Sequence, residues 1–186
     1  MGDLIGKSVK RVEDNRLLKG EGKYTDDFNM AHQTYAVYVR SPHAHANIKS
    51  VDISAAEAMD GVVKVFTGQD IADAGIVGSI CGWQVDFKNG DTMKEPPHPI
   101  MVVDKVRHVG DPVAMVIAED KYTAKDATEL VHVDYEVLNA VVNPKAAAQD
   151  SAVQVHDDVP NNIIFEWELG DKAATDAAFE NAHHIT

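Results

Sequence analysis

The chain has 186 residues, 45% of them hydrophobic, and a formal net charge of -13 at pH 7. It is long and apolar enough to bury a core as a globular domain, and its acidic charge disfavours nucleic acid, whose phosphates it would repel. The single cysteine, Cys81, excludes an internal disulfide framework and any cysteine-rich zinc or iron–sulfur site built from this chain alone.

The location of the protein is predicted from what the sequence lacks. No apolar run approaches the roughly 20 residues that span a bilayer. The N-terminal sequence MGDLIGKSVKRVEDN has no apolar central segment of the kind found in secretory signals. We therefore expect a cytoplasmic protein.

Charge is distributed unevenly along the chain. Residues 1–23 contain six basic and four acidic side chains, a balance of +2, whereas the remaining residues contain 11 basic and 26 acidic ones, a balance of -15. Two interpretations stay open: a solvated arm on an acidic domain, or an arm that docks on an acidic surface of its own protein or of a partner. The docking hypothesis assigns the contacts to Lys7, Lys10, Arg11 and Arg16.

The first predicted elements are two strands. Residues 33–40 are rich in aromatic and β-branched side chains, and Pro42 ends this strand because proline cannot donate to a ladder. Residues 46–53 alternate again. The apolar spacing shifts by one between Ile48 and Val51, which predicts a bulge or twist.

A short helix and a third strand follow. Ser54 is a predicted helix N-cap, with Glu57 three residues later to complete a capping box. Gly61 ends that helix. Residues 62–67 predict the next strand, and residues 68–71 predict a turn into one helical turn.

Residues 74–99 form a stretch of 26 residues without clear periodicity, longer than the usual connection in a compact domain. We expect a functional or partner-facing excursion here. Its glycines match neither a phosphate loop nor a dinucleotide fingerprint, because no strand feeds them and no clear helix follows. Cys81 and Trp83 either face a partner or anchor the loop on the core; burial is favoured, since both residue types are usually buried.

The most regular part of the chain begins at Gly110, which we expect to take a positive φ in a tight turn. Residues 113–118 are apolar on both faces and predict a central, fully covered strand. A helix starting at Lys121 presents alanines small enough to lie close on a sheet. With a strand over residues 133–137, the pattern predicts a split βαβ-type unit with a right-handed crossover.

The C-terminal segment predicts one more strand, over residues 163–169. A last amphipathic helix over residues 172–182 follows, with Asp171 as its N-cap. Together these elements predict an α+β domain.

His43 and His45 lie two positions apart, so in an extended segment they point to the same face. A metal site would need a third ligand with supporting contacts, and the candidates lie on separate elements: His32, His108, His132 and His183. The alternative is a strand-end pair satisfied by backbone or water. The sequence contains no nucleophile elbow, zinc-protease motif, calcium loop or Cys-x-x-Cys.

Six blocks, in order along the chain, resemble the N-terminal stretch of the molybdenum-binding large subunit of the xanthine oxidase family. The likeness covers nearly the whole chain and is weakest over residues 74–94. Two further blocks, PPHP and WELGDK, are similar to the branch of aerobic carbon monoxide dehydrogenases. The six blocks are RVEDNRLLKG (11–20), GKYTDD (22–27), RSPHAHA (40–46), TGQD (67–70), KVRHVGDPVA (105–114) and VDYE (133–136).

The resemblance implies an α/β hammerhead with a mixed sheet and flanking helices. In that family, hydroxylation occurs at molybdenum bound by molybdopterin, and electrons pass through two [2Fe-2S] clusters to FAD. The cofactor-binding loops and the catalytic glutamate lie in later domains, so the resemblance places no catalytic, cofactor or metal residue in this chain. It also implies that the RSPHAHA histidines serve packing or a contact with a neighbouring subunit.

The resemblance further implies a division into an N-terminal arm (1–30), a hammerhead core (31–150) and a C-terminal strand and helix (151–186) that lead toward molybdenum-binding domains. Because no cluster or flavin region precedes the hammerhead, we expect separate iron–sulfur and flavin subunits as partners. The predicted role is structural, in assembly; a stand-alone interaction or scaffold domain is the alternative. The predicted interface residues are Lys7, Lys10, Arg11, Arg16, His43, His45, Cys81 and Trp83.

Overall fold

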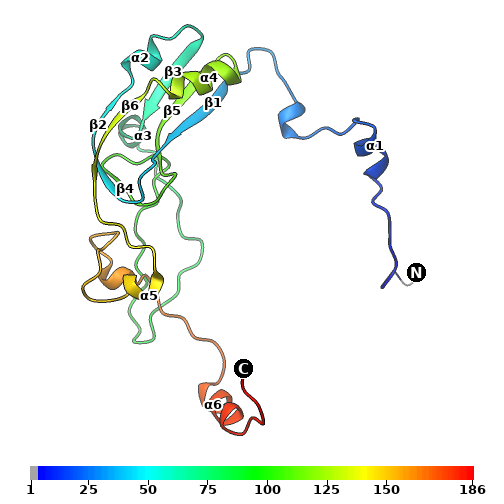
Figure 1. Ribbon diagram of the computed structural model, residues 1–186, viewed down its shortest axis with the longest axis vertical. Helices are drawn as coiled ribbons and strands as arrows, with labels where there is room; N and C mark the ends of the chain where they lie inside the picture. Colours follow the sequence, from blue (N-terminus) through cyan, green and yellow to red (C-terminus); the bar gives the residue numbers. More distant parts are fainter. Residues whose placement is uncertain (1–3) are drawn as a thin grey trace. The chain divides into compact units, whose positions relative to one another are not determined.

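The computed structural model describes residues 4–186 of the chain, which divides into two compact units, Met1–Thr34 and Tyr35–Thr186 (Figure 1). The described part of the first unit contains only two short helices, α1 (Asp14–Leu18) and η1 (Thr25–Asp27), and neither has a buried residue. No helix within residues 4–186 is long and apolar enough to cross a membrane.

The second unit contains a three-stranded antiparallel sheet in the order β1-β5-β3 (Figure 1). β5 (Pro112–Ala118) lies between β1 (Tyr35–Arg40) and β3 (Val62–Thr67). Val113 and Ala114 are adjacent, point to opposite faces, and are both fully buried. The prediction of a central strand covered on both faces is confirmed.

A second antiparallel sheet has the order β4-β2-β6. Its strands are β4 (Lys105–Val106), β2 (Ala46–Asp52) and β6 (His132–Val137). The register against β6 shifts between Ile48 and Ser50, which confirms the predicted irregularity. The α+β architecture with flanking helices is confirmed, but its strands form two antiparallel sheets and not one mixed sheet.

The predicted βαβ unit is wrong, although its three elements exist. Helix α4 (Lys121–Thr128) follows β5 and packs against β1 and β5, with the small residues Ala124 and Ala127 fully buried. β6 then joins the other sheet, antiparallel to β2. A split βαβ unit needs its two strands parallel in one sheet, whereas β5 and β6 belong to different sheets.

Two buried clusters connect these sheets. One contains Val65, Val116 and Ala127, and the other contains Val106 and Val113. Val51 of β2 and Val133 of β6 are half-buried and pack against both clusters. The two sheets therefore share one continuous apolar interior.

Helix α2 (Ser54–Glu57) begins differently from the prediction. Ser54 is not its N-cap: that position is Ile53, which makes no side-chain cap. The amide and hydroxyl of Ser54 both donate to the carboxylate of Asp52, at 2.9 and 2.6 Å, and this bonding, the hydroxyl first, lowers the pKa of Asp52. Glu57 pairs instead with Lys64 on β3, at 2.6 Å.

A true capping box opens helix α3 (Gly68–Asp73), where the sequence predicted only a helical turn. The Thr67 side chain accepts from the amide of Asp70, and the Asp70 carboxylate accepts from the amide of Thr67. The hydroxyl of Thr67, donating at 2.6 Å, is the main cause of the lowered pKa of Asp70. Gly68 is required here because a Cβ would lie 2.1 Å from the carbonyl oxygen of Val102.

The excursion over residues 74–99 has no helix or strand beyond one isolated bridge, between Ser79 and His98, as its lack of periodicity predicted. The strand expected over residues 163–169 is not formed. One backbone bond joins this segment to the excursion, from the Lys94 amide to the Ile164 carbonyl at 2.8 Å. A single bond does not make a ladder, so the alternation of apolar residues there does not become a strand.

The remaining elements are short. They are α5 (Pro144–Ala147), η2 (Pro160–Asn162) and α6 (Lys172–Glu180). Asp171 caps α6 by accepting from the amide of Ala174 at 3.0 Å, as predicted. The division at residues 30 and 150 stays a prediction, since the two compact units meet after Thr34.

Candidate functional site

The RSPHAHA block connects β1 to β2, and hydrogen bonds join it to the turn before β5. The Ser41 amide donates to the Asp111 carbonyl at 2.9 Å, and the Gly110 amide donates to the Ser41 carbonyl at 2.8 Å. The Arg40 guanidinium adds a bond to the Gly110 carbonyl at 2.9 Å. Two of the six sequence blocks are thus halves of one structural feature.

The Gly110 turn is also held from within. Gly110 has φ +93°, which confirms the predicted positive φ. The buried carboxylate of Asp111 accepts from the amides of Arg107 and His108, at 2.6 and 3.3 Å. It also lies 3.2 Å from Nδ1 of His108. The sequence did not indicate this role of Asp111, although an aspartate after a turn glycine was a usable signal.

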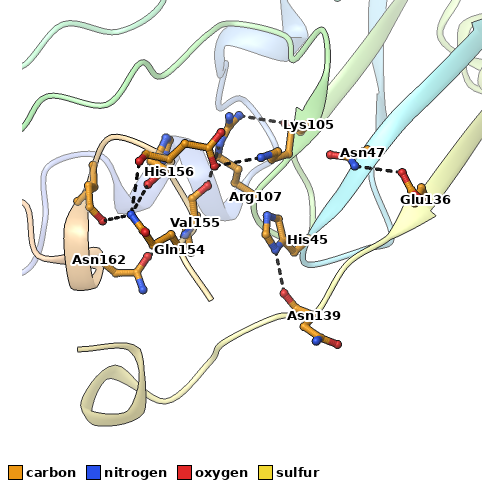
Figure 2. A network of polar contacts seen from close by, with 12 residues as sticks. His45, Asn47, Lys105, Arg107, Glu136, Asn139, Gln154, Val155, His156 and Asn162 are labelled. Carbon is orange, nitrogen blue, oxygen red and sulfur yellow. Dashed lines mark hydrogen bonds and ion pairs between the residues drawn. The ribbon is translucent and has the colours of Figure 1, made fainter. Parts of the chain in front are cut away.

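His45 is only 5% exposed and ties β2 to the segment after β6. Its Nδ1 lies 2.8 Å from the carbonyl oxygen of Asn139 (Figure 2), so Nδ1 carries the donated proton. Its Nε2 is buried without a hydrogen-bond partner in the described chain. The role of His45 at an interface stays a prediction.

His43 packs edge-on against Tyr135 of β6, with ring centroids 5.0 Å apart at 71°. Burial raises the pKa of the Tyr135 hydroxyl, and a hydrogen bond with Ser41 partly offsets the rise. His43 therefore has a packing partner of its own, and its contact with another subunit stays a prediction. Within residues 4–186, no three His, Cys, Asp or Glu side chains are grouped so that they could hold a metal ion.

The basic residues of the arm lie on an exposed, mostly extended segment. Arg11 pairs with Asp14 at 2.9 Å and Arg16 with Glu13 at 3.1 Å, each three residues apart. Such exposed pairs contribute little to stability. The arm also exposes large apolar side chains, namely Leu4, Ile5, Val9, Val12 and Leu18.

The expectation that Cys81 and Trp83 are buried is wrong. Cys81 is an exposed free cysteine, and Trp83 is 74% exposed. The Cys81 thiol bonds to the carbonyl of Trp83 at 2.9 Å, a contact within the loop itself. A contact of Cys81 and Trp83 with a partner stays a prediction.

The excursion and the segment after η2 contact each other, and both expose large apolar side chains. Lys88 pairs with Glu168 at 2.6 Å, and this hydrogen bond raises the pKa of Lys88. A groove of about 470 Å³ lies where the two segments meet, lined in part by Val77, Ile80 and Ile164. We call this the loop–tail surface; its exposed large apolar residues are Ile76, Val77, Ile80, Trp83, Ile164, Phe165, Trp167 and Leu169.

Two antiparallel sheets with flanking helices, closed by the interlocked turns at Ser41 and Gly110, define an α/β hammerhead domain. The family model described as "aldehyde oxidase and xanthine dehydrogenase, a/b hammerhead domain" matches residues 19–139. The chain belongs to this family, and it is the hammerhead domain of a large subunit of the carbon monoxide dehydrogenase and xanthine oxidase type.

Individual relatives agree with this assignment. The carbon monoxide dehydrogenase large chain of Afipia carboxidovorans is 36% identical over 194 residues, covering 98% of this chain and 23% of that protein. The nicotine 6-hydroxylase large subunit of Paenarthrobacter nicotinovorans is 40% identical over 187 residues, with 98% and 21% covered. The crystal structure of a Cu,Mo-CO dehydrogenase superimposes with a TM-score of 0.73 at 35% identity, over 96% of this chain and 23% of that one. The chain thus spans less than a quarter of the length of these relatives.

Proposed function

We propose that this chain is the assembly domain of the large subunit of a molybdenum hydroxylase and that it contributes no catalytic residue. The observation that carries the proposal is the loop–tail surface, which exposes large apolar side chains on segments without regular structure. Several large exposed apolar side chains on two segments that contact each other are typical of a surface that another protein covers. In this proposal, the molybdenum-binding domains of the same polypeptide and the iron–sulfur and flavin subunits are the partners.

The donor groups of the chain do not fit the cofactors that this family implies. A [2Fe-2S] cluster takes four thiolate ligands, or two thiolates and two imidazoles, whereas the chain has one cysteine. In the proposal, molybdopterin-bound molybdenum is held by domains beyond this chain, and the clusters and FAD by partner subunits. The exposed free thiol of Cys81 suits a reducing compartment, so we place the complex in the cytoplasm.

The test of the assembly role uses the full-length large subunit, co-expressed with its partner subunits. Trp83→Ser and Trp167→Ser remove exposed rings from the loop–tail surface and should weaken assembly, because buried tryptophans contribute strongly to interfaces. Tyr122→Ser is the matched control, since Tyr122 is 81% exposed on α4, outside that surface. Complex formation is followed by size exclusion with mass determination.

Two results would contradict the proposal. One is a complex of the tryptophan variants that assembles like the control at every protein concentration. The other is stoichiometric molybdenum, or turnover, in the purified 186-residue chain. A reading frame continuous with Thr186, next to frames for a cysteine-rich and a flavin subunit, would separate the proposal from the stand-alone scaffold alternative.

A further inference from the structure

A cleft of about 260 Å³ lies on the second unit where three distant segments meet. Four of its lining side chains can carry positive charge, and one lining side chain is a carboxylate. This is unusual in a chain with a net charge of -13. The polar lining residues are Ser79, His98, Arg107, His108, Asp111 and His156.

Arg107 is held in place by backbone carbonyls and not by an acidic side chain. Its Nε donates to Val155 at 3.2 Å and its Nη1 to Lys105 at 3.1 Å. Lys105 in turn pairs with Asp157 at 3.4 Å. The two bonds from Arg107 fix the orientation of its guanidinium, which has five N–H donors in all.

The segment that carries His156 is held equally firmly. The Asn162 side chain accepts from the amide of Val155 at 2.8 Å and donates to the carbonyls of Ala147 and Val153, at 2.9 and 3.0 Å. Asn162 has φ +55°, a left-handed conformation that asparagine tolerates. Its three bonds fix the wall of the cleft on which His156 lies.

The electrostatics of the cleft are those of a crowded cationic site. Burial lowers the pKa of His156, and repulsion from Arg107 and from His98 lowers it further, against the opposing effect of Asp158 and Asp157. The rings of His98 and His156 lie 6.5 Å apart.

The one lining carboxylate does not neutralise these groups. Asp111 already accepts from two backbone amides and faces His108. The imidazole of His98 lies 3.1 Å from the carbonyl of Pro96, through Nδ1, which leaves Nε2 available. Donors from Arg107, His98 and His156 therefore line the same cleft, whose one lining carboxylate is already engaged; Asp157 and Asp158, which also act on His156, are not among the lining residues.

We propose that this cleft binds a small free oxyanion of the sulfate or phosphate type. A dianion would accept charge-assisted hydrogen bonds from the guanidinium and the imidazoles, and it would remove their mutual repulsion. The cleft volume lies below that of sites for drug-sized ligands and suits a small ion. This inference is independent of the proposed assembly role.

Sulfate is the probe of choice because it stays a dianion throughout the range in which histidines titrate. The 186-residue chain is titrated with sodium sulfate at constant ionic strength, made up with chloride, and its histidine rings are followed by NMR. Sulfate should raise the pKa of His156 by at least about 0.5 unit and change the ring signals of His98, and it should bind about tenfold more tightly near pH 5.5 than near pH 8.

Variants separate the cleft from general screening. His156→Gln and His98→Gln should each weaken sulfate binding at least about threefold at low pH, whereas His132→Gln, an exposed histidine on β6, should leave it unchanged. Equal changes of the His132 and His156 ring signals on addition of sulfate, or an equal effect of chloride, would overturn the proposal. So would tighter binding of phenyl phosphate than of sulfate. The titration of the parent chain decides the question even where a variant is unstable.

Discussion

Gly110 and Asp111 are adjacent and stabilise the turn before β5 in two different ways. Gly110 supplies a backbone conformation, with φ +93°, and the Asp111 carboxylate satisfies the amides that this conformation leaves pointing inward. Neighbouring Ser41 adds two backbone bonds from a segment about 70 residues earlier. The turn is thus stabilised locally and at long range.

Gly110→Val should lower the free energy of unfolding by about 1–3 kcal/mol, because a β-branched residue is strained at positive φ. A Cβ built at this glycine meets nothing within 4 Å, so the whole effect comes from the backbone. Gly82→Val is the matched control, since a Cβ there also meets nothing and φ is not positive. Thermal or urea unfolding measures both, and identical curves for Gly110→Val and the parent would refute the argument.

His156 gives the domain a predictable response to acid. Burial, the largest cause, and Arg107 lower its pKa in the folded state from 6.5, so the unfolded chain binds a proton more readily. The free energy of unfolding should therefore fall as the pH drops below about 6.5. In His156→Gln this part of the pH dependence should be absent. Urea unfolding of parent and variant between about pH 8 and about pH 5 tests this; parallel pH profiles would count against it.

Among the elements, strands were easier to predict than their partners. The β1, β3 and β6 segments lie within two residues of the predicted ranges, because alternation of apolar side chains is a local property. Pairing is not local: β5 pairs with β1 and β3, and β6 joins the other sheet. Residues 163–169 alternate just as well, yet form no strand, because no partner ladder reaches them.

The same contrast holds for the candidate site: features set by neighbouring residues could be predicted, and contacts between distant residues could not. The positive φ of Gly110 was predictable, since a tight turn before a strand needs it. The pairing of His45 with Asn139, 94 residues away, was not. The exposure of Trp83 was predicted wrongly because residue type indicates average burial and says nothing of what a loop lies against.

The N-terminus of α4 allows a direct test at this scale. The Asp120 carboxylate accepts from the amides of Tyr122 and Thr123, at 2.8 and 3.0 Å, and hydrogen bonds with Thr123 lower its pKa. Asp120→Ala should reduce the melting temperature, because it leaves two helix amides without an acceptor. Asp126→Ala, which removes an exposed carboxylate from the same helix, is the control. An equal change in both variants would show that net charge, and not capping, is responsible.

At the scale of the whole molecule, the chain combines a packed interior with segments that expose large apolar side chains. The interior joins the two sheets through Val51 and Val133. The loop–tail surface and the arm, by contrast, expose large apolar side chains. A domain of this kind fits a role in which its neighbours complete its packing.

Deletion of residues 1–23 from the full-length large subunit, co-expressed with its partners, should weaken assembly. The segment carries basic and apolar side chains together, and such charges contribute more once a partner desolvates them. Size exclusion at low and moderate salt follows complex formation, and the loss should be greatest at low salt, where charge steering is strongest. A deletion complex that assembles and turns over like the parent at every salt would remove the arm from the mechanism.

The position of the excursion between β3 and β5 has a further consequence, for how such domains can diversify. β3 and β5 are neighbours in one sheet, so residues 74–99 lie inside a loop that the fold must close in any case. The entropy of closing a flexible loop grows only with the logarithm of its length, so that doubling the length costs about 0.6 kcal/mol. The excursion can therefore lengthen, shorten or change its side chains at little cost to the sheet. Related hammerhead domains can therefore keep the same sheets while the length and side chains of this excursion differ from one protein to another.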